Sequence, residues 1–181
     1  NCINLFRFRS FWQCFGWQFY IHLASFLMTV GSSQFITEIS KYVIGRLRPH
    51  FFDLCQPRLP DGTILNRSST CPNPYTYVTD YSCSTEGTAD PELLIDVHRS
   101  FMSGHSSLSA VCLVYLVIYI QSRFWLWQSF LGYIRHLFQA GLICLVIYTG
   151  LSRISDYKHH WSDVLVGLIQ GTLVAVLSAV Y

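Results

Sequence analysis

Long apolar stretches alternate with short polar segments along most of this chain. Four stretches carry no lysine, arginine, aspartate or glutamate, and they cover residues 10–37, 100–122, 136–152 and 164–181. A helix that crosses a bilayer needs roughly 20 mostly apolar residues. Each stretch therefore predicts one span, and we place the spans at about 12–36, 106–122, 136–151 and from 162 onward. The expected fold class is all-α, a polytopic transmembrane helix bundle of about four spans.

The composition agrees with a membrane protein. Charged residues make up 12% of the 181 residues, about half of the ~25% that is usual in soluble domains. A soluble protein with four buried helices would need a polar shell that this chain does not have. The length suits a single domain over residues 1–181. The net charge is only +2 and no basic tract is present, so a nucleic-acid partner is not expected.

Residues 50–99 form a long polar segment between the first two spans. It contains five prolines, three cysteines (Cys55, Cys71 and Cys83) and the tripeptide Asn66-Arg67-Ser68. The tripeptide is an N-glycosylation acceptor pattern, although such patterns also occur by chance. Together these features predict an extracellular or lumenal loop with one disulfide and one cysteine left over, with the pairing open. The cysteines are too widely spaced for a metal site.

A pair of cations follows the first span. Lys41 and Arg48 are seven residues apart, which is two turns along one helical face. Pro49 disfavours helical dihedrals at Arg48, so we expect the helix to end there. Two cations on one face could bind a phosphate. The alternative is that both side chains reach toward lipid headgroups.

A second polar cluster precedes the second span. Ser103, Gly104 and His105 stand directly before an apolar run. A glycine at a helix start lets backbone N–H groups approach an anion closely, while the serine adds a hydroxyl and the histidine a titratable proton. The alternative is an N-capping serine followed by a histidine at the membrane interface.

The third cluster is the densest polar run between two apolar ones. Residues 152–163 read S-R-I-S-D-Y-K-H-H-W-S-D and provide Arg153, His159 and Asp163. The last two are four residues apart and would share a face if both lay on one helix. A carboxylate so placed could orient a nucleophilic or basic histidine. The alternative is a short loop in which Asp163 only caps the next helix.

Counting spans predicts that the three clusters share one side of the membrane. With four spans, Arg7, Arg9, Arg123 and Arg135 fall together on the other side, which the positive-inside tendency assigns to the cytoplasm. Eight further lysines and arginines then lie outside, against that tendency, but long loops translocate largely regardless of charge. The clusters are therefore expected to form one site on the extracellular or lumenal face.

The collected side chains suit phosphoryl transfer. Three cations and several neutral donors match the oxygens of a phosphoryl group, and two histidines supply a nucleophile and a general acid. No carboxylate cluster is available to hold Mg²⁺, so neither a metal nor another cofactor is expected. Residues 159–163 could be a fragment of a metal site, but they lack the adjacent-turn histidine pair of zinc hydrolases.

With these three clusters, the chain resembles a known family, the type 2 phosphatidic acid phosphatase superfamily, and in particular its lipid phosphate phosphatase branch. The family pattern is K-x6-R-P, then P-S-G-H, then S-R-x5-H-x3-D. The first and third motifs are complete here, from Lys41 to Pro49 and from Ser152 to Asp163. In the second motif Met102 replaces the proline. The resemblance covers nearly the whole chain, and the family is related to the vanadium haloperoxidases.

The resemblance implies a role for each motif residue. His159 would attack phosphorus and form a phosphohistidine, with Asp163 orienting it, and His105 would protonate the leaving alkoxide. The phosphoryl oxygens would be bound by Lys41, Arg48, Ser103, Gly104 and Arg153. The implied partners are a lipid phosphate and the bilayer, and a homo-oligomer is left open.

Lipid phosphate phosphatases have six spans, and the four expected here match the third to the sixth. We therefore expect an N-terminally truncated fragment of a multi-pass protein, with the plasma membrane as the expected location. The implied reaction is Mg²⁺-independent hydrolysis of phosphatidate, lysophosphatidate, sphingosine 1-phosphate or a similar phosphomonoester. The alternatives are a catalytically silent scaffold or lipid-binding relative, and a phosphatase for a non-lipid phosphate.

Overall fold

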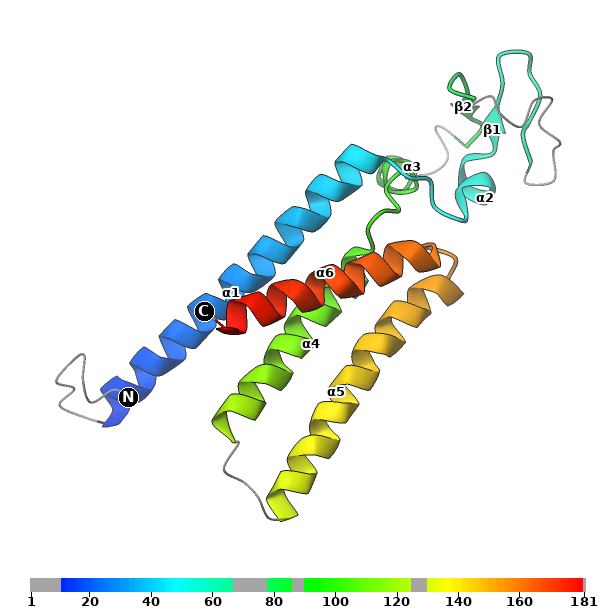
Figure 1. Cartoon of the computed structure of the whole chain (residues 1–181). Coiled ribbons are helices and arrows are strands. Elements are labelled where there is room, and N and C mark those ends of the chain that lie inside the picture. Colours follow the sequence, from blue (N-terminus) through cyan, green and yellow to red (C-terminus); the bar gives the residue numbers. More distant parts are fainter. Residues whose placement is uncertain (1–10, 67–77, 86–89, 125–129, 181) are drawn as a thin grey trace.

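Four long helices dominate the computed structural model, which describes residues 11–66, 78–85, 90–124 and 130–180. They are α1 (Phe11–Ile44), α4 (Gly104–Arg123), α5 (Phe130–Ser155) and α6 (Trp161–Val180). Helix α4 packs against the other three and most extensively against α6 (Figure 1). The predicted all-α helix bundle is confirmed.

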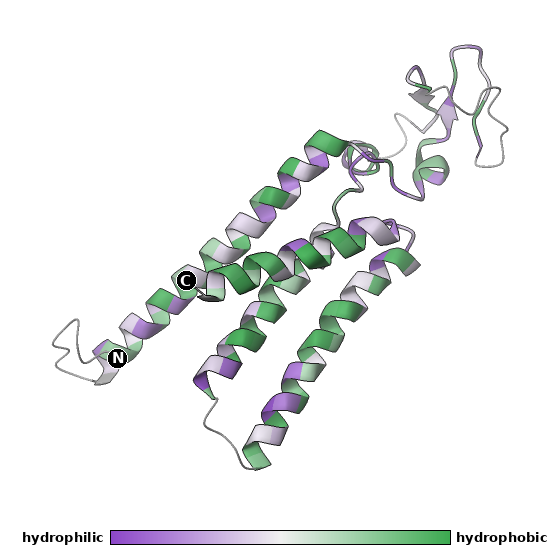
Figure 2. Ribbon diagram, in the orientation of Figure 1, coloured by the Kyte–Doolittle hydropathy of each residue, from purple (hydrophilic) through white to green (hydrophobic). Residues whose placement is uncertain are grey.

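Three of the four helices, α4, α5 and α6, are long and apolar enough to cross a membrane, and Figure 2 shows that hydrophobic residues predominate along them. Helix α1 is the longest at 34 residues. It is not among the three because polar residues, including Gln13, Gln18, His22 and Gln34, recur along it. Three of the four predicted spans therefore correspond to helices that could cross a membrane. That α1 also crosses it stays a prediction.

The helices extend beyond the charge-free stretches that predicted them. Helix α5 runs from Phe130 to Ser155, whereas residues 136–151 were expected, and Arg153 lies in its last turn. A basic residue is favourable at this position because it complements the helix dipole. Arg7, Arg9 and Cys71, which supported the predicted sidedness and loop, lie outside the described residues.

Glycines bring α4 and α6 into close contact. A Cβ atom added at Gly167 would lie 2.7 Å from the carbonyl oxygen of Ser103, and one added at Gly171 would clash with the carbonyl oxygen of Ser107. Small residues at helix interfaces let backbones approach in this way. The first turn of α4 is thereby fixed against α6.

A buried polar network around Ser107, about one turn along α4 from Gly104, joins α1, α4 and α6. The Ser107 hydroxyl donates to Gln170 Oε1 over 2.7 Å and lies 3.0 Å from the hydroxyls of both Ser33 and Thr37. Interhelical hydrogen bonds of this kind stabilise helix contacts inside a membrane. The network therefore holds the three helices in register beneath the end of the bundle where the polar clusters lie.

The described parts of the predicted loop 50–99 form a small cap beyond this end of the bundle (Figure 1). It contains α2 (Phe51–Cys55), β1 (Pro57–Arg58), β2 (Ser82–Cys83) and α3 (Pro91–Asp96), and the two strands pair antiparallel. Cys55 and Cys83 form a disulfide, and Phe51 and Val97 form a local apolar core with Cys55. The prediction of a disulfide among the loop cysteines is confirmed.

Candidate active site

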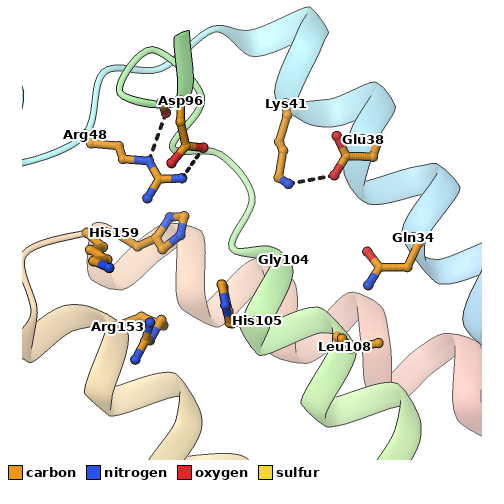
Figure 3. Close-up of a pocket in the computed structure, with 11 residues that line it drawn as sticks. Gln34, Glu38, Lys41, Arg48, Asp96, Gly104, His105, Leu108, Arg153 and His159 are labelled. Atoms are coloured by element: carbon orange, nitrogen blue, oxygen red, sulfur yellow. Dashed lines mark hydrogen bonds and ion pairs between the residues drawn. The ribbon is translucent and has the colours of Figure 1, made fainter. Parts of the chain in front are cut away.

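A pocket of about 360 Å³ lies at the cap end of the bundle. Its walls come from α1, α3, α4 and α5 and from the segments that precede α2 and α6 (Figure 3). The lining residues are Gln34, Glu38, Lys41, Arg48, Asp96, Gly104, His105, Leu108, Arg153, Lys158 and His159. The three polar clusters, which are far apart in sequence, therefore meet in one place, as the sequence predicts.

His159 lies on the short segment between α5 and α6 and is almost fully buried. Its Nδ1 is 2.8 Å from the carbonyl oxygen of Ser100. Because a carbonyl can only accept, Nδ1 carries the proton, and the lone pair is on Nε2. Burial, together with the nearby Arg48 guanidinium, lowers the pKa of His159 from 6.5 to about 4. The imidazole is therefore neutral at pH 7 with a free nitrogen, as a nucleophile requires.

Asp163 is fully buried in the first turn of α6. Its carboxylate accepts from the Ser100 hydroxyl over 2.5 Å, from the backbone N–H of His160 over 3.2 Å and from Arg46 Nη1 over 2.7 Å. The contact with His160 resembles half of a capping box, in which the third helical residue reaches back to the N-cap. The capping alternative for Asp163 is thus part of its role.

The predicted direct pairing of Asp163 with His159 is wrong. The expectation required both residues to lie on one helix, but α6 begins at Trp161, after the histidine. The His159 N–H donates to the Ser100 carbonyl, and the Ser100 hydroxyl donates to Asp163. Asp163 is therefore connected to the histidine through Ser100.

Two residues of this arrangement were not singled out from the sequence. Arg46 pairs with Asp163 and also donates to the Ser162 hydroxyl over 2.8 Å. Ser100 is fully buried, and its N–H donates to the carbonyl oxygen of Arg46 over 2.8 Å. Arg46 is an unspecified position inside the K-x6-R-P motif, and Ser100 precedes the S-G-H segment, so their spacing carries no signal of either contact.

Each predicted phosphate-binding cation is paired with a carboxylate. The pairs are Lys41 with Glu38 at 2.6 Å, Arg48 with Asp96 at 2.6 Å, and Arg153 with Asp156 at 3.0 Å. The cationic side chains are 11–22% exposed and the carboxylates 47–52% exposed. The cations line the pocket, contrary to the alternative in which Lys41 and Arg48 reach toward headgroups. Lys158, which the sequence did not single out, lines it as well.

Helix α4 begins at the pocket. Its first residue is Gly104, where an added Cβ would lie 3.4 Å from Lys41 Nζ. The first-turn N–H groups and the helix dipole favour an anion at this point. His105 follows, and Figure 3 places its ring between Arg153 and Lys41. The pocket thus combines a positive helix end, two histidines and four cations.

Ser103 does not line this pocket. It is fully buried and is the N-cap of α4, with its hydroxyl oxygen accepting from the Ser106 hydroxyl over 2.9 Å. Ser103 therefore caps the helix, which was the alternative to phosphate binding in the sequence analysis. Contact of its hydroxyl with a phosphoryl oxygen stays a prediction. Met102, which replaces the family proline, is also buried and away from the pocket lining.

The structure is thus an integral-membrane type of helix bundle with a buried histidine and a cation-lined pocket at one end. The comparison with family models is specific: the PAP2 superfamily model matches residues 22–181. The chain belongs to this superfamily, as its three motifs indicated.

Curated relatives of the chain include proteins named phospholipid phosphatases. The chain is 43% identical over 162 residues to phospholipid phosphatase 1 of Mus musculus, an alignment that covers 90% of this chain and 52% of the relative. It is 42% identical over 160 residues to phospholipid phosphatase 2 of Homo sapiens, covering 88% and 50%. The chain thus spans about half the length of the curated relatives it matches. No solved structure matches it.

Proposed function

We propose that this chain carries the active site of an integral-membrane lipid phosphate phosphatase. The substrates are phosphomonoesters such as phosphatidate, lysophosphatidate or sphingosine 1-phosphate. The observation that carries the proposal is the neutral His159, with its proton fixed on Nδ1 by Ser100, in a pocket lined by cations. The names of the relatives support a phospholipid as the substrate class.

In the first step, His159 Nε2 attacks phosphorus, and the bond from phosphorus to the lipid ester oxygen breaks. His105 gives its proton to that oxygen, so the alcohol leaves neutral. In the second step, water attacks the phosphohistidine while His105 accepts a proton from it. The phosphorus–nitrogen bond breaks, inorganic phosphate leaves and both histidines return to their starting forms.

The cations replace a metal ion in this proposal. Lys41, Arg48, Arg153 and Lys158 all line the pocket, and together with the first turn of α4 they offset the charge that develops on the phosphoryl oxygens. Arginine's planar fork suits bidentate contact with such oxygens. The carboxylates Glu38 and Asp96 at the pocket are each already paired with a cation, so the reaction is proposed to need no Mg²⁺.

The active site is proposed to face the extracellular space or the lumen of an internal compartment, in a protein of the plasma membrane. The cap beside the pocket contains the Cys55–Cys83 disulfide, and disulfides persist in oxidising compartments. Asn66 is exposed on the same cap and is the proposed glycosylation site. A gel mobility that glycosidase does not change, and that is the same in Asn66→Gln, would argue against glycosylation.

The deciding experiment measures phosphate release from these lipids by the full-length protein in EDTA. Turnover that His159→Ala abolishes would support the proposal. Activity that EDTA removes and Mg²⁺ restores would contradict the metal-free mechanism. Lipid binding without turnover would favour a silent lipid-binding relative, and turnover of soluble phosphates alone would favour a non-lipid substrate.

A further inference from the structure

The pocket is longer than a phosphate site requires. Figure 3 places His159 and Arg48 at one end and Gln34 and Leu108 at the other, with His105 between them. Gln34, Glu38 and Lys41 lie on one face of α1 at steps of four and three residues. From Lys41 to Gln34 the helix rises roughly 10 Å. The pocket therefore continues between α1 and α4 for about two turns beyond the cations.

The proposed reaction decides what occupies this extension. In phosphoryl transfer the attacking and leaving atoms lie roughly in line with phosphorus between them. If His159 attacks from one end, the leaving oxygen points toward His105, and the carbon atoms that follow it lie along Leu108 and Gln34. The half-exposed Leu108 side chain gives this part of the pocket an apolar wall.

Two polar groups face the start of that alcohol. The Glu38 carboxylate is half exposed and lies 2.6 Å from Lys41 Nζ. Gln34 lines the pocket one turn further along, and among the residues that the structure describes none is hydrogen-bonded to its amide. A carboxylate next to a phosphate dianion is unfavourable unless a donor lies between them. Lys41 is one such donor, and the substrate can supply a second.

We infer that Glu38 and Gln34 form a subsite for the substituent on the carbon adjacent to the phosphate-bearing carbon. A carboxylate with a neighbouring amide oxygen accepts hydrogen bonds, so the subsite favours lipid phosphates with a free ammonium or hydroxyl group there. Lipids in which the same group is acylated offer a weaker donor or none. This assignment rests on the proposed function and names the substrate class for the same pocket.

A matched pair of lipids tests the subsite. Sphingosine 1-phosphate and ceramide 1-phosphate differ at this carbon in carrying an ammonium group or an acylated nitrogen. The measurement is the ratio of their kcat/KM values for the full-length protein in mixed micelles. Glu38→Gln should lower the ratio about tenfold or more, because it removes a charge-assisted hydrogen bond.

Asp156→Asn is the control, because it also removes a carboxylate paired with a cation, Arg153, but Asp156 does not line the pocket. The ratio should not change in this variant. Gln34→Leu leaves the Lys41–Glu38 pair intact and should lower the ratio about fivefold; it tests the same subsite if Glu38→Gln does not accumulate.

Two results together would overturn the subsite: an equal loss of kcat/KM on both lipids in Glu38→Gln, and an unchanged ratio of the two kcat/KM values in Gln34→Leu. Glu38 would then act only through Lys41. Failure of the unmodified protein to hydrolyse these two lipids and also phosphatidate and lysophosphatidate would overturn the proposed function itself. The two failures are therefore distinguishable.

Discussion

The Arg46 guanidinium lies 2.7 Å from the Asp163 carboxylate, although the two residues are 117 positions apart. Asp163 is fully buried while the Arg46 side chain is 40% exposed. The pair joins the end of α1 to the start of α6. It also completes the chain of contacts from Asp163 through Ser100 to the proposed nucleophile.

Replacing Arg46 alone should therefore lower the free energy of unfolding more than replacing both Arg46 and Asp163. Arg46→Gln leaves a buried carboxylate without its counter-ion. Loss of one partner of a fully buried pair costs about 3–5 kcal/mol, and the exposure of Arg46 reduces this to about 1–3 kcal/mol because water screens part of the interaction. Thermal unfolding of Arg46→Gln, Asp163→Asn and the double variant in detergent measures the coupling. Strictly additive losses would show that the pair is not coupled.

The sequence predicts the meeting of the clusters but not the contacts within the site. Motif spacing and span counting bring Lys41, His105 and Arg153 to one end of the bundle because each stands at the end of an apolar stretch. The Asp163 pairing fails because residue spacing does not reveal that α6 starts at Trp161. Contacts such as that of Arg46 with Asp163 depend on how the helix ends are packed together, which no local pattern encodes.

The titration of His159 should distinguish it from an ordinary surface histidine. Its pKa is lowered from 6.5 to about 4 by burial first and by the Arg48 charge second. The ring is therefore neutral above about pH 4, whereas an unperturbed histidine gains its proton near pH 6.5. Carbon NMR of labelled histidine in nanodiscs, with His159→Asn for assignment, measures the midpoint.

Arg48→Gln should raise that midpoint toward 6.5, because it removes a positive charge that disfavours the protonated ring. The control is Arg58→Gln, since Arg58 lies exposed on β1 in the cap. A His159 midpoint near 6.5 in the unmodified protein would remove the basis for a neutral nucleophile across the acidic pH range.

Even the addition of one methyl group at Gly167 should disturb the contact between α4 and α6. An added methyl group would meet the Ser103 carbonyl at 2.7 Å and push the first turn of α4, with Gly104 and His105, away from α6. Overpacking of this kind costs typically about 1–3 kcal/mol, so Gly167→Ala should lower both thermal stability and kcat. Gly141→Ala on α5 is the control because nothing lies within 4 Å of the added atom. Equal effects of the two substitutions would contradict the close contact.

The last prediction separates the two histidines by the leaving group. A lipid alcohol is a poor leaving group and needs a proton, so His105→Ala should reduce kcat/KM on phosphatidate by about 10²–10⁴-fold. An aryl phosphate leaves as a stable phenolate and needs little protonation. His105→Ala should therefore retain much more activity on the aryl ester, whereas His159→Ala should be inactive on both substrates and form no phosphoenzyme.

Asp163→Asn provides the comparison. It disturbs Ser100 and through it the orientation of His159, not the leaving group, so its loss should be similar on both substrates. The measurement is kcat/KM for phosphatidate and an aryl phosphate across the three variants, with trapping of the phosphoenzyme. Equal losses on both substrates in His105→Ala would mean that this histidine binds the phosphate and does not donate the proton. The cations that surround it in the pocket would then be its functional partners.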